Sequence, residues 1–201
     1  MSAVITPGEV REHAEGGTPA RGFGWYAMIF FLASEAVFFA NLIASYLYLR
    51  VRSGQWPPEP MGPGFELERT LPIIATLVLL SSSFPMHFGS RAIARGEQRK
   101  GALLIGATAI LGAIFLSCQA WEYTHADFNP STNIFGSAFF TLTGFHGAHV
   151  TGGVLFLLVV FFRASKGHFS KDSHFPVTAV EMYWHFVDAV WIVLFTVLYL
   201  L

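Results

Sequence analysis

The stretch FFLASEAVFFA, residues 30–40, places one acid, Glu35, in the middle of a long apolar segment. From Phe23 to Leu49 the chain runs for 27 residues with no other charged side chain. An apolar segment of about 20 residues is long enough to span a bilayer as a helix. An acid at the centre of such a helix costs about 2.5–3.5 kcal/mol on insertion scales. We therefore expect either a polar partner for Glu35 on another helix or a protonated carboxyl group.

The composition predicts an integral membrane protein. Of 201 residues, 53% are hydrophobic and 12% are charged, about half the charged share of a soluble domain. The net charge of −1, without a basic patch, argues against a nucleic-acid partner. The single cysteine, Cys118, permits neither an intrachain disulfide nor a two-cysteine metal centre.

Four further apolar segments follow the first, so we predict an all-α membrane protein with a bundle of five transmembrane helices. The expected helices are residues 23–50, 70–94, 101–123, 135–162 and 177–201, within one transmembrane domain at 23–201. Residues 1–22 are polar and rich in glycine and charge, and we expect a flexible tail there.

The distribution of Lys and Arg predicts the orientation. Nine of the twelve lie in the N-terminal tail and in the segments after the second and fourth helices, and the other three are Arg50, Arg52 and Arg69. Positive charge is concentrated on the cytoplasmic side of membrane proteins. The N-terminus is thus expected inside and the C-terminus outside.

Several polar residues are expected at a similar depth in the membrane. With a rise of 1.5 Å per residue, Glu35 lies ~18 Å from the inner face, near the middle of a core about 30 Å thick. We predict a buried intramembrane polar network in which His149, ahead of His146, contacts Glu35. The predicted members are Glu35, His146, His149, Glu181, His185 and Asp188.

Each polar residue admits a structural and a functional interpretation. Glu35 and a histidine form either a hydrogen bond that joins two helices or part of a proton relay. A metal or haem site at His146 and His149 is disfavoured, because a stripe at Gly144, Ala148 and Gly152 predicts close helix packing with little room for a macrocycle. His185 and Asp188 are expected to orient one another.

Two further observations limit the chemistry. His87 is expected to be a lone polar group satisfied locally, and Trp184 and Trp191 to be packing residues. The EMYWH segment, 181–185, has the wrong spacing for a di-iron bundle. Nucleophile, phosphate-binding and zinc-protease motifs are missing, so we predict no metal ligands, no cofactor ligands and no catalytic residues in this chain.

Five motifs, in order, carry a resemblance to a known family. They are SEAVFFA (34–40), GQWPP (54–58), QAWEY (119–123), GFHGAHVTGG (144–153) and YWHFVDAVWIVLFTVLY (183–199). Together they resemble subunit III of the haem–copper terminal oxidases over almost all of residues 23–201. By this resemblance the family's helix-1 acid is Glu35, its histidine pair is His146 and His149, and its last motif includes Trp184, His185 and Asp188.

The resemblance implies a non-catalytic subunit of a proton-pumping oxidase in a bacterial plasma membrane. Such a subunit packs against subunit I, which holds the haems and copper, and it supports proton uptake, binds phospholipid and protects the active site during turnover. The chain resembles a five-helix form without the first two helices of larger members, so a lipid cleft there would need walls from another subunit. Cytochrome c is the expected electron donor, and the alternatives are a quinol oxidase subunit and an independent proton carrier.

Overall fold

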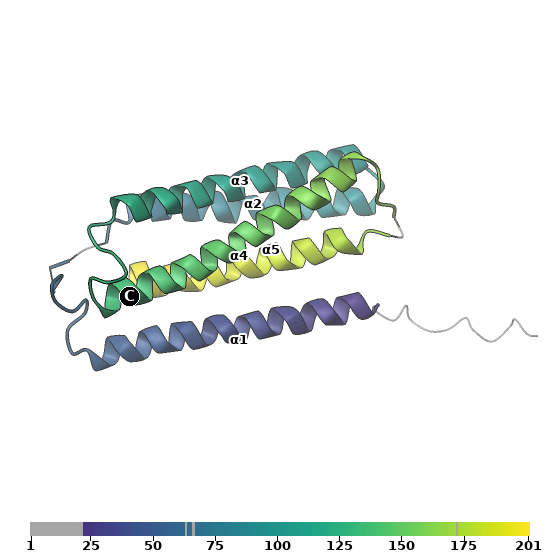
Figure 1. The fold of residues 1–201 in the computed structure, drawn as a ribbon. Coiled ribbons are helices and arrows are strands. Elements are labelled where there is room, and N and C mark those ends of the chain that lie inside the picture. The colour runs from purple at the N-terminus through teal and green to yellow at the C-terminus, as the bar shows by residue number, and fades with distance from the viewer. Residues whose placement is uncertain (1–21, 63, 66, 172) are drawn as a thin grey trace, which may run out of the picture.

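The computed structural model describes residues 22–62, 64–65, 67–171 and 173–201. Within these ranges the chain forms five long helices and no strand (Figure 1). The helices are α1 (Phe23–Arg52), α2 (Thr70–Ala94), α3 (Gln98–His125), α4 (Ile134–Ser165) and α5 (Phe175–Phe195), and α5 continues into a π-helical turn, η1 (Thr196–Leu200). Each of the five is long and apolar enough to cross a membrane. The protein is thus an all-α, multi-pass membrane protein.

The observed helices extend up to three residues beyond the predicted spans. For example, α3 begins at Gln98 where residue 101 was expected, and α4 ends at Ser165 where residue 162 was expected. The predicted limits were the limits of apolar runs, whereas a helix continues for as long as its backbone hydrogen bonds continue. The predicted flexible tail, residues 1–22, lies outside the described residues apart from Gly22, which precedes α1.

Two helices form the most extensive contact, the antiparallel hairpin of α2 and α3 (Figure 1). Gly96, with φ +88°, ends α2 in a conformation that favours glycine. The two helices then approach closely at Gly101, where an added Cβ would lie 2.5 Å from Ile93. In the turn, Arg95 Nε donates to Glu97 Oε1 at 3.0 Å, and this hydrogen bond lowers the pKa of the Glu97 carboxyl group.

Trp184 of α5 joins three helices. Its side chain is fully buried, and its ring lies against Gly112 of α3 and Gly153 of α4. An added Cβ would lie 2.5 Å from the ring at Gly112 and 2.8 Å at Gly153. Trp184 Nε1 also donates to Ser82 Oγ of α2 at 2.8 Å. The core of the bundle is therefore built from α2, α3, α4 and α5 around this indole.

In contrast, α1 lies at the edge of the bundle, against α5 and α4 (Figure 1). Of its 30 residues, Phe39 and Tyr46 are buried, whereas α5 buries nine of 21. The loop after α1 is attached to the start of α4, because Asn133 Nδ2 donates to Pro58 O at 2.8 Å. The Asn133 side-chain oxygen in turn accepts from the Gly136 backbone N–H and caps α4.

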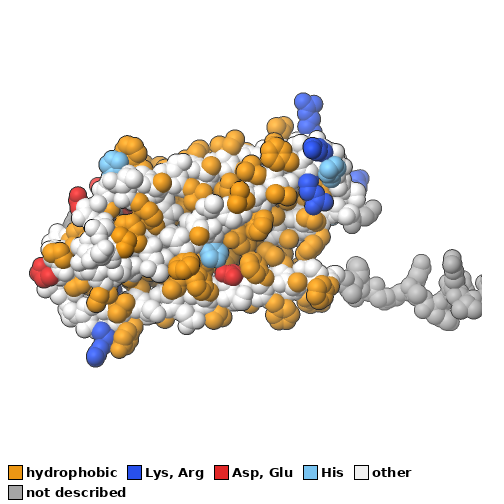
Figure 2. Space-filling model, in the orientation of Figure 1, with side chains coloured by type: hydrophobic (Ala, Val, Ile, Leu, Met, Phe, Trp, Pro, Cys, Tyr) orange, Lys and Arg blue, Asp and Glu red, His pale blue; other side chains and the backbone are white. Residues whose placement is uncertain are grey.

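The basic side chains are unevenly distributed between the two ends of the bundle. In Figure 2, Lys and Arg gather at the end where α1 and α3 begin and α2 and α4 finish. The described basic residues at or near this end are Arg91, Arg95, Arg99, Lys100, Arg163, Lys166 and Lys171. Arg50, Arg52 and Arg69 belong to the opposite end. We call these the basic end and the opposite end.

Candidate functional site

The first polar site joins α1 to α4. Glu35 Oε2 lies 2.9 Å from His149 Nε2, and both side chains are partly exposed, at 23% and 18%. The predicted contact of Glu35 with His149 rather than His146 is therefore confirmed, whereas the predicted burial of the pair is not met within this chain. Aromatic rings enclose the histidine, with the Phe39 ring centroid 4.8 Å away. Figure 2 shows an acidic and a histidine side chain together at mid-length, surrounded by hydrophobic side chains.

The hydrogen bonds of His149 determine how many protons the pair holds. Its Nδ1 lies 2.7 Å from the Phe145 carbonyl oxygen, which can only accept, so Nδ1 carries a hydrogen. One further proton lies between Nε2 and Glu35 Oε2, because two lone pairs do not form a hydrogen bond. The pair is then either neutral acid with neutral imidazole or carboxylate with imidazolium. In both forms its net charge is zero, which suits a site within the membrane.

His146 does not belong to this pair. Its side chain is fully buried and stacks on Trp191, with ring centroids 4.7 Å apart, while Phe115 lies edge-on at 5.8 Å. Neither ring nitrogen has a hydrogen-bond partner among the described residues. Although His146 and His149 are three residues apart, the former packs toward α3 and α5 and the latter toward α1.

A second polar site joins α2 to α5 through Ser83. The Ser83 hydroxyl donates to Asp188 Oδ2 and lies 3.1 Å from His185 Nδ1. Because the hydroxyl hydrogen is used on Asp188, Ser83 Oγ accepts from a protonated His185 Nδ1. The predicted orientation of His185 by Asp188 is therefore indirect. Sequence reasoning did not single out Ser83, since serine is common in membrane helices and its partners are on another helix.

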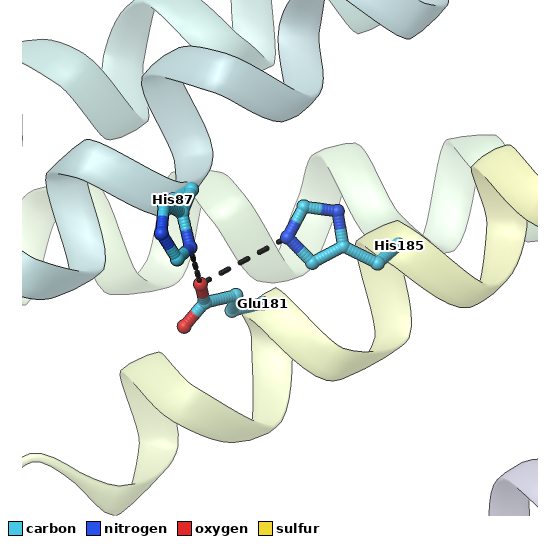
Figure 3. Close-up of side chains that lie close together, drawn as sticks. All are labelled: His87, Glu181 and His185. Atoms are coloured by element: carbon cyan, nitrogen blue, oxygen red, sulfur yellow. Dashed lines mark hydrogen bonds and ion pairs between the residues drawn. The ribbon is translucent and has the colours of Figure 1, made fainter.

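His87 and Glu181 complete this second site (Figure 3). His87 Nδ1 lies 2.9 Å from Glu181 Oε1, and His185 Nε2 lies 3.8 Å from the same oxygen. The prediction that His87 is a lone polar group is wrong. A usable signal was present, because His87 is seven residues before the end of α2 and Glu181 six after the start of α5. Both positions are thus ~9–11 Å from the basic end.

The predicted single network is also wrong, since the structure divides its members into separate groups. Glu35 and His149 join α1 to α4, whereas Glu181, His185 and Asp188 lie with His87 and Ser83 between α2 and α5. His146 packs apart from both groups. These residues lie at similar depths, but their helices direct them toward different neighbours, so similar depth does not bring them into contact.

The prediction that Gly144, Ala148 and Gly152 form the close-packed side of α4 is wrong too. Ala148 is exposed, and an added Cβ at Gly144 or Gly152 would meet a tyrosine hydroxyl at the ordinary distances of 3.8 and 3.7 Å. In this part of α4 the close approaches are instead at Gly147, where an added Cβ would lie 2.9 Å from Gln119 Oε1, and at Gly153 against Trp184. Large side chains from α3 and α5, rather than another helix backbone, occupy the space that these glycines leave.

The QAWEY motif forms contacts at the opposite end of the bundle. Gln119 Nε2 donates to Thr143 O at 2.8 Å, and Tyr199 Oη donates to Glu122 Oε1 at 2.8 Å. Trp121 stacks on His125 with ring centroids 4.2 Å apart. The motif therefore connects α3 to α4 and to the last turn of the chain, which accounts for its polar residues structurally.

Comparison with known proteins gives a consistent result along the chain. Residues 12–201 match the family described as cytochrome c oxidase subunit III. A cytochrome c oxidase subunit 3 from Synechocystis sp. is 45% identical over 100% of this chain and 84% of its own length. The subunit from Thermostichus vulcanus is 44% identical over 87% of this chain and 85% of its own. That of Bos taurus is 37% identical over 87% and 68%.

Proposed function

The chain belongs to the cytochrome c oxidase subunit III family, and from that premise we propose that it serves its oxidase complex without supplying a redox centre or a catalytic residue. The observation that carries the proposal is the family match over residues 12–201. The relatives are named for cytochrome c oxidase, so the quinol oxidase alternative is not favoured. Haems and copper are then expected in partner subunits.

We further propose that the face bearing Glu35 and His149 is covered by the catalytic subunit I of the complex. This polar pair is partly exposed on the surface of the chain near the middle of α1. Polar groups within the membrane generally face protein or a water-filled cavity, because contact with hydrocarbon is costly. The sparse burial of α1 supports the same assignment, since little of this helix is covered by its own chain.

The proposed contribution of the subunit is to support proton entry into the complex and to protect the active site during turnover. We assign proton entry to the basic end, where Glu181, His87 and His185 lie. The complex is placed in a bacterial plasma membrane, and the near full-length matches to Synechocystis sp. and T. vulcanus support this placement.

Removal of the chain from the purified oxidase tests the role. The depleted complex should reduce oxygen at the initial rate of the intact one and then lose activity over successive turnovers, faster at high pH where protons are scarce. A depleted complex with intact haem spectra and no initial activity would show that the chain is part of the catalytic machinery. Unchanged activity through prolonged turnover would limit its role to assembly, and a chain that purifies without haem-bearing partners would support the carrier alternative.

The proposed orientation, N-terminus inside and C-terminus outside, has its own test. In a Cys118→Ser background, Asp127→Cys should react with a membrane-impermeant thiol reagent added outside intact cells, and Arg99→Cys should react only after the cells are opened. Asp127 lies between α3 and α4, and Arg99 is in the first turn of α3 at the basic end. The reverse labelling pattern would invert the orientation.

A further inference from the structure

We propose that His87, Glu181 and His185 form a binding site for a divalent transition-metal ion, represented by Zn²⁺, that bridges α2 and α5. Each residue offers one ligand atom, and the three atoms lie within 4.8 Å of one another (Figure 3). Two imidazole nitrogens and one carboxylate oxygen are the ligand set of many three-ligand zinc sites. This inference departs from the sequence-based expectation that the chain has no metal ligands. It concerns the same three residues that lie at the proposed proton-entry end, but it rests on their geometry alone.

Two of the three distances between ligand atoms are close to those around a tetrahedral ion. Zinc–nitrogen and zinc–oxygen distances of about 2.0–2.2 Å place neighbouring ligand atoms ~3.3 Å apart. The two contacts of Glu181 Oε1, 2.9 Å to His87 Nδ1 and 3.8 Å to His185 Nε2, fall on either side of that value. The three ligand atoms lie within 4.8 Å of one another, so the site closes if the His87 imidazole, whose side chain is 41% exposed, rotates toward His185, which Ser83 holds.

The tautomer of His185 is already the one that a metal requires. Ser83 Oγ accepts from His185 Nδ1, so in the neutral ring the lone pair is on Nε2, the atom that faces Glu181. Ser83 is held by donation to Asp188. Metal-binding histidines commonly carry such a second hydrogen bond, often through a carboxylate, which fixes the ring and raises its basicity.

Charge and access favour the ion as well. Glu181 is a ligand with one negative charge, and Asp188 is connected to His185 by hydrogen bonds through Ser83. These two acids balance a divalent cation within the membrane. The Glu181 side chain is 17% exposed, so the carboxylate is held in place while the partly exposed imidazoles leave a route of entry from the surface.

The ligand types select among metals. Mg²⁺ and Ca²⁺ prefer oxygen ligands, whereas imidazole suits zinc and its transition-metal neighbours. The open fourth position is free for water or for a group from a partner subunit. Because the ligands come from two helices, the bound ion would hold α2 and α5 together near the basic end.

The test measures zinc binding by the intact oxidase complex after treatment with a chelator. By equilibrium dialysis, the wild-type complex should bind one more Zn²⁺ than the His87→Gln or the Glu181→Gln complex. Ser83→Ala, which removes the support of His185 but no ligand, should weaken that binding by about 10–100-fold. His125→Gln is the matched control, since His125 is an exposed histidine stacked on Trp121 at the opposite end.

Three results would overturn the proposal. They are equal zinc content and affinity in wild type and all variants, the same loss in His125→Gln as in His87→Gln, and zinc bound through oxygen or sulfur ligands only. The zinc X-ray absorption edge of the wild-type complex gives the last readout and needs no variant. Two imidazole nitrogens and a carboxylate oxygen should appear there, even if a ligand variant fails to assemble.

Discussion

Helices α1 and α5 each carry an acid that contacts a histidine of another helix, yet the interfaces around the two acids differ greatly. Glu35 lies on a helix with two buried residues in 30, and Glu181 on a helix with nine in 21. In α1 the polar contact stands beside limited packing, in which Phe39 and Tyr46 are the buried residues. In α5 packing around Trp184 holds the helix whether or not Glu181 is paired. Loss of an acid–histidine contact should therefore affect the attachment of α1 more than that of α5.

The largest effect should come from the packed region. Trp184→Ala removes the indole between α3 and α4 and leaves a cavity, so it should lower the free energy of unfolding by about 3–5 kcal/mol. A denaturation series on the detergent-solubilised protein gives this value. A loss below that of the α1 substitutions described next would show that Trp184 is not the centre of the bundle.

The next effect tests the attachment of α1. Glu35→Ala leaves His149 Nε2 without its partner and should cost about 1–3 kcal/mol. Hydrogen exchange should rise in α1 and remain unchanged in α2 and α3. Equal exchange in all helices would indicate that α1 is not a separate, weakly held element.

The Glu35→Gln variant sharpens the same measurement. With Nδ1 already donating to Phe145 O, Nε2 of the neutral imidazole can accept from the new amide. If the pair is neutral in the wild type, Glu35→Gln should retain most of the stability that Glu35→Ala loses. Equal losses in the two variants would show that an amide cannot replace the carboxyl group as the partner of His149.

The loss of a single hydrogen bond should have a smaller effect, and it can be compared between the two regions. Trp191 Nε1 donates to Thr76 Oγ1 at 2.9 Å, and Trp56 Nε1 donates to Tyr46 Oη at the longer distance of 3.3 Å. Thr76→Val, which removes the acceptor of Trp191 at nearly constant volume, should cost about 1 kcal/mol, and Tyr46→Phe less than that. Unfolding curves of the two variants measure the difference, and the opposite order would contradict the ranking of the two regions.

The smallest effect should occur at His146. Its ring nitrogens have no partner in the described part of the chain, and the ring packs between Trp191 and Phe115. His146→Leu should therefore change stability by less than about 1 kcal/mol, since an apolar side chain of similar size replaces an unpaired polar one. His149→Leu is the matched comparison and should resemble Glu35→Ala. A large loss in His146→Leu would reveal a polar partner for this ring.

Glu35 and His149 show how far the candidate sites could be predicted. Their pairing followed from depth, because each lies near the middle of its own helix. Depth did not predict the neighbours of His146, which lies at the level of His149 but packs against Trp191. The depth of His87 was not compared with that of Glu181, although the two residues lie at similar distances from the basic end. Ser83 escaped notice because its role depends on two α5 residues that lie more than 100 positions away.

By itself the sequence determined which segments are long and apolar enough to cross a membrane, and how far along its own helix each polar residue lies. These are properties of one segment at a time, since hydropathy and the rise per residue need no neighbour. Only the tertiary structure decided which helices adjoin and how each is rotated about its axis. That choice depends on large side chains such as Trp184 fitting against glycines on other helices. Rotation, rather than depth, separated His149 from His146 and brought His87 to Glu181.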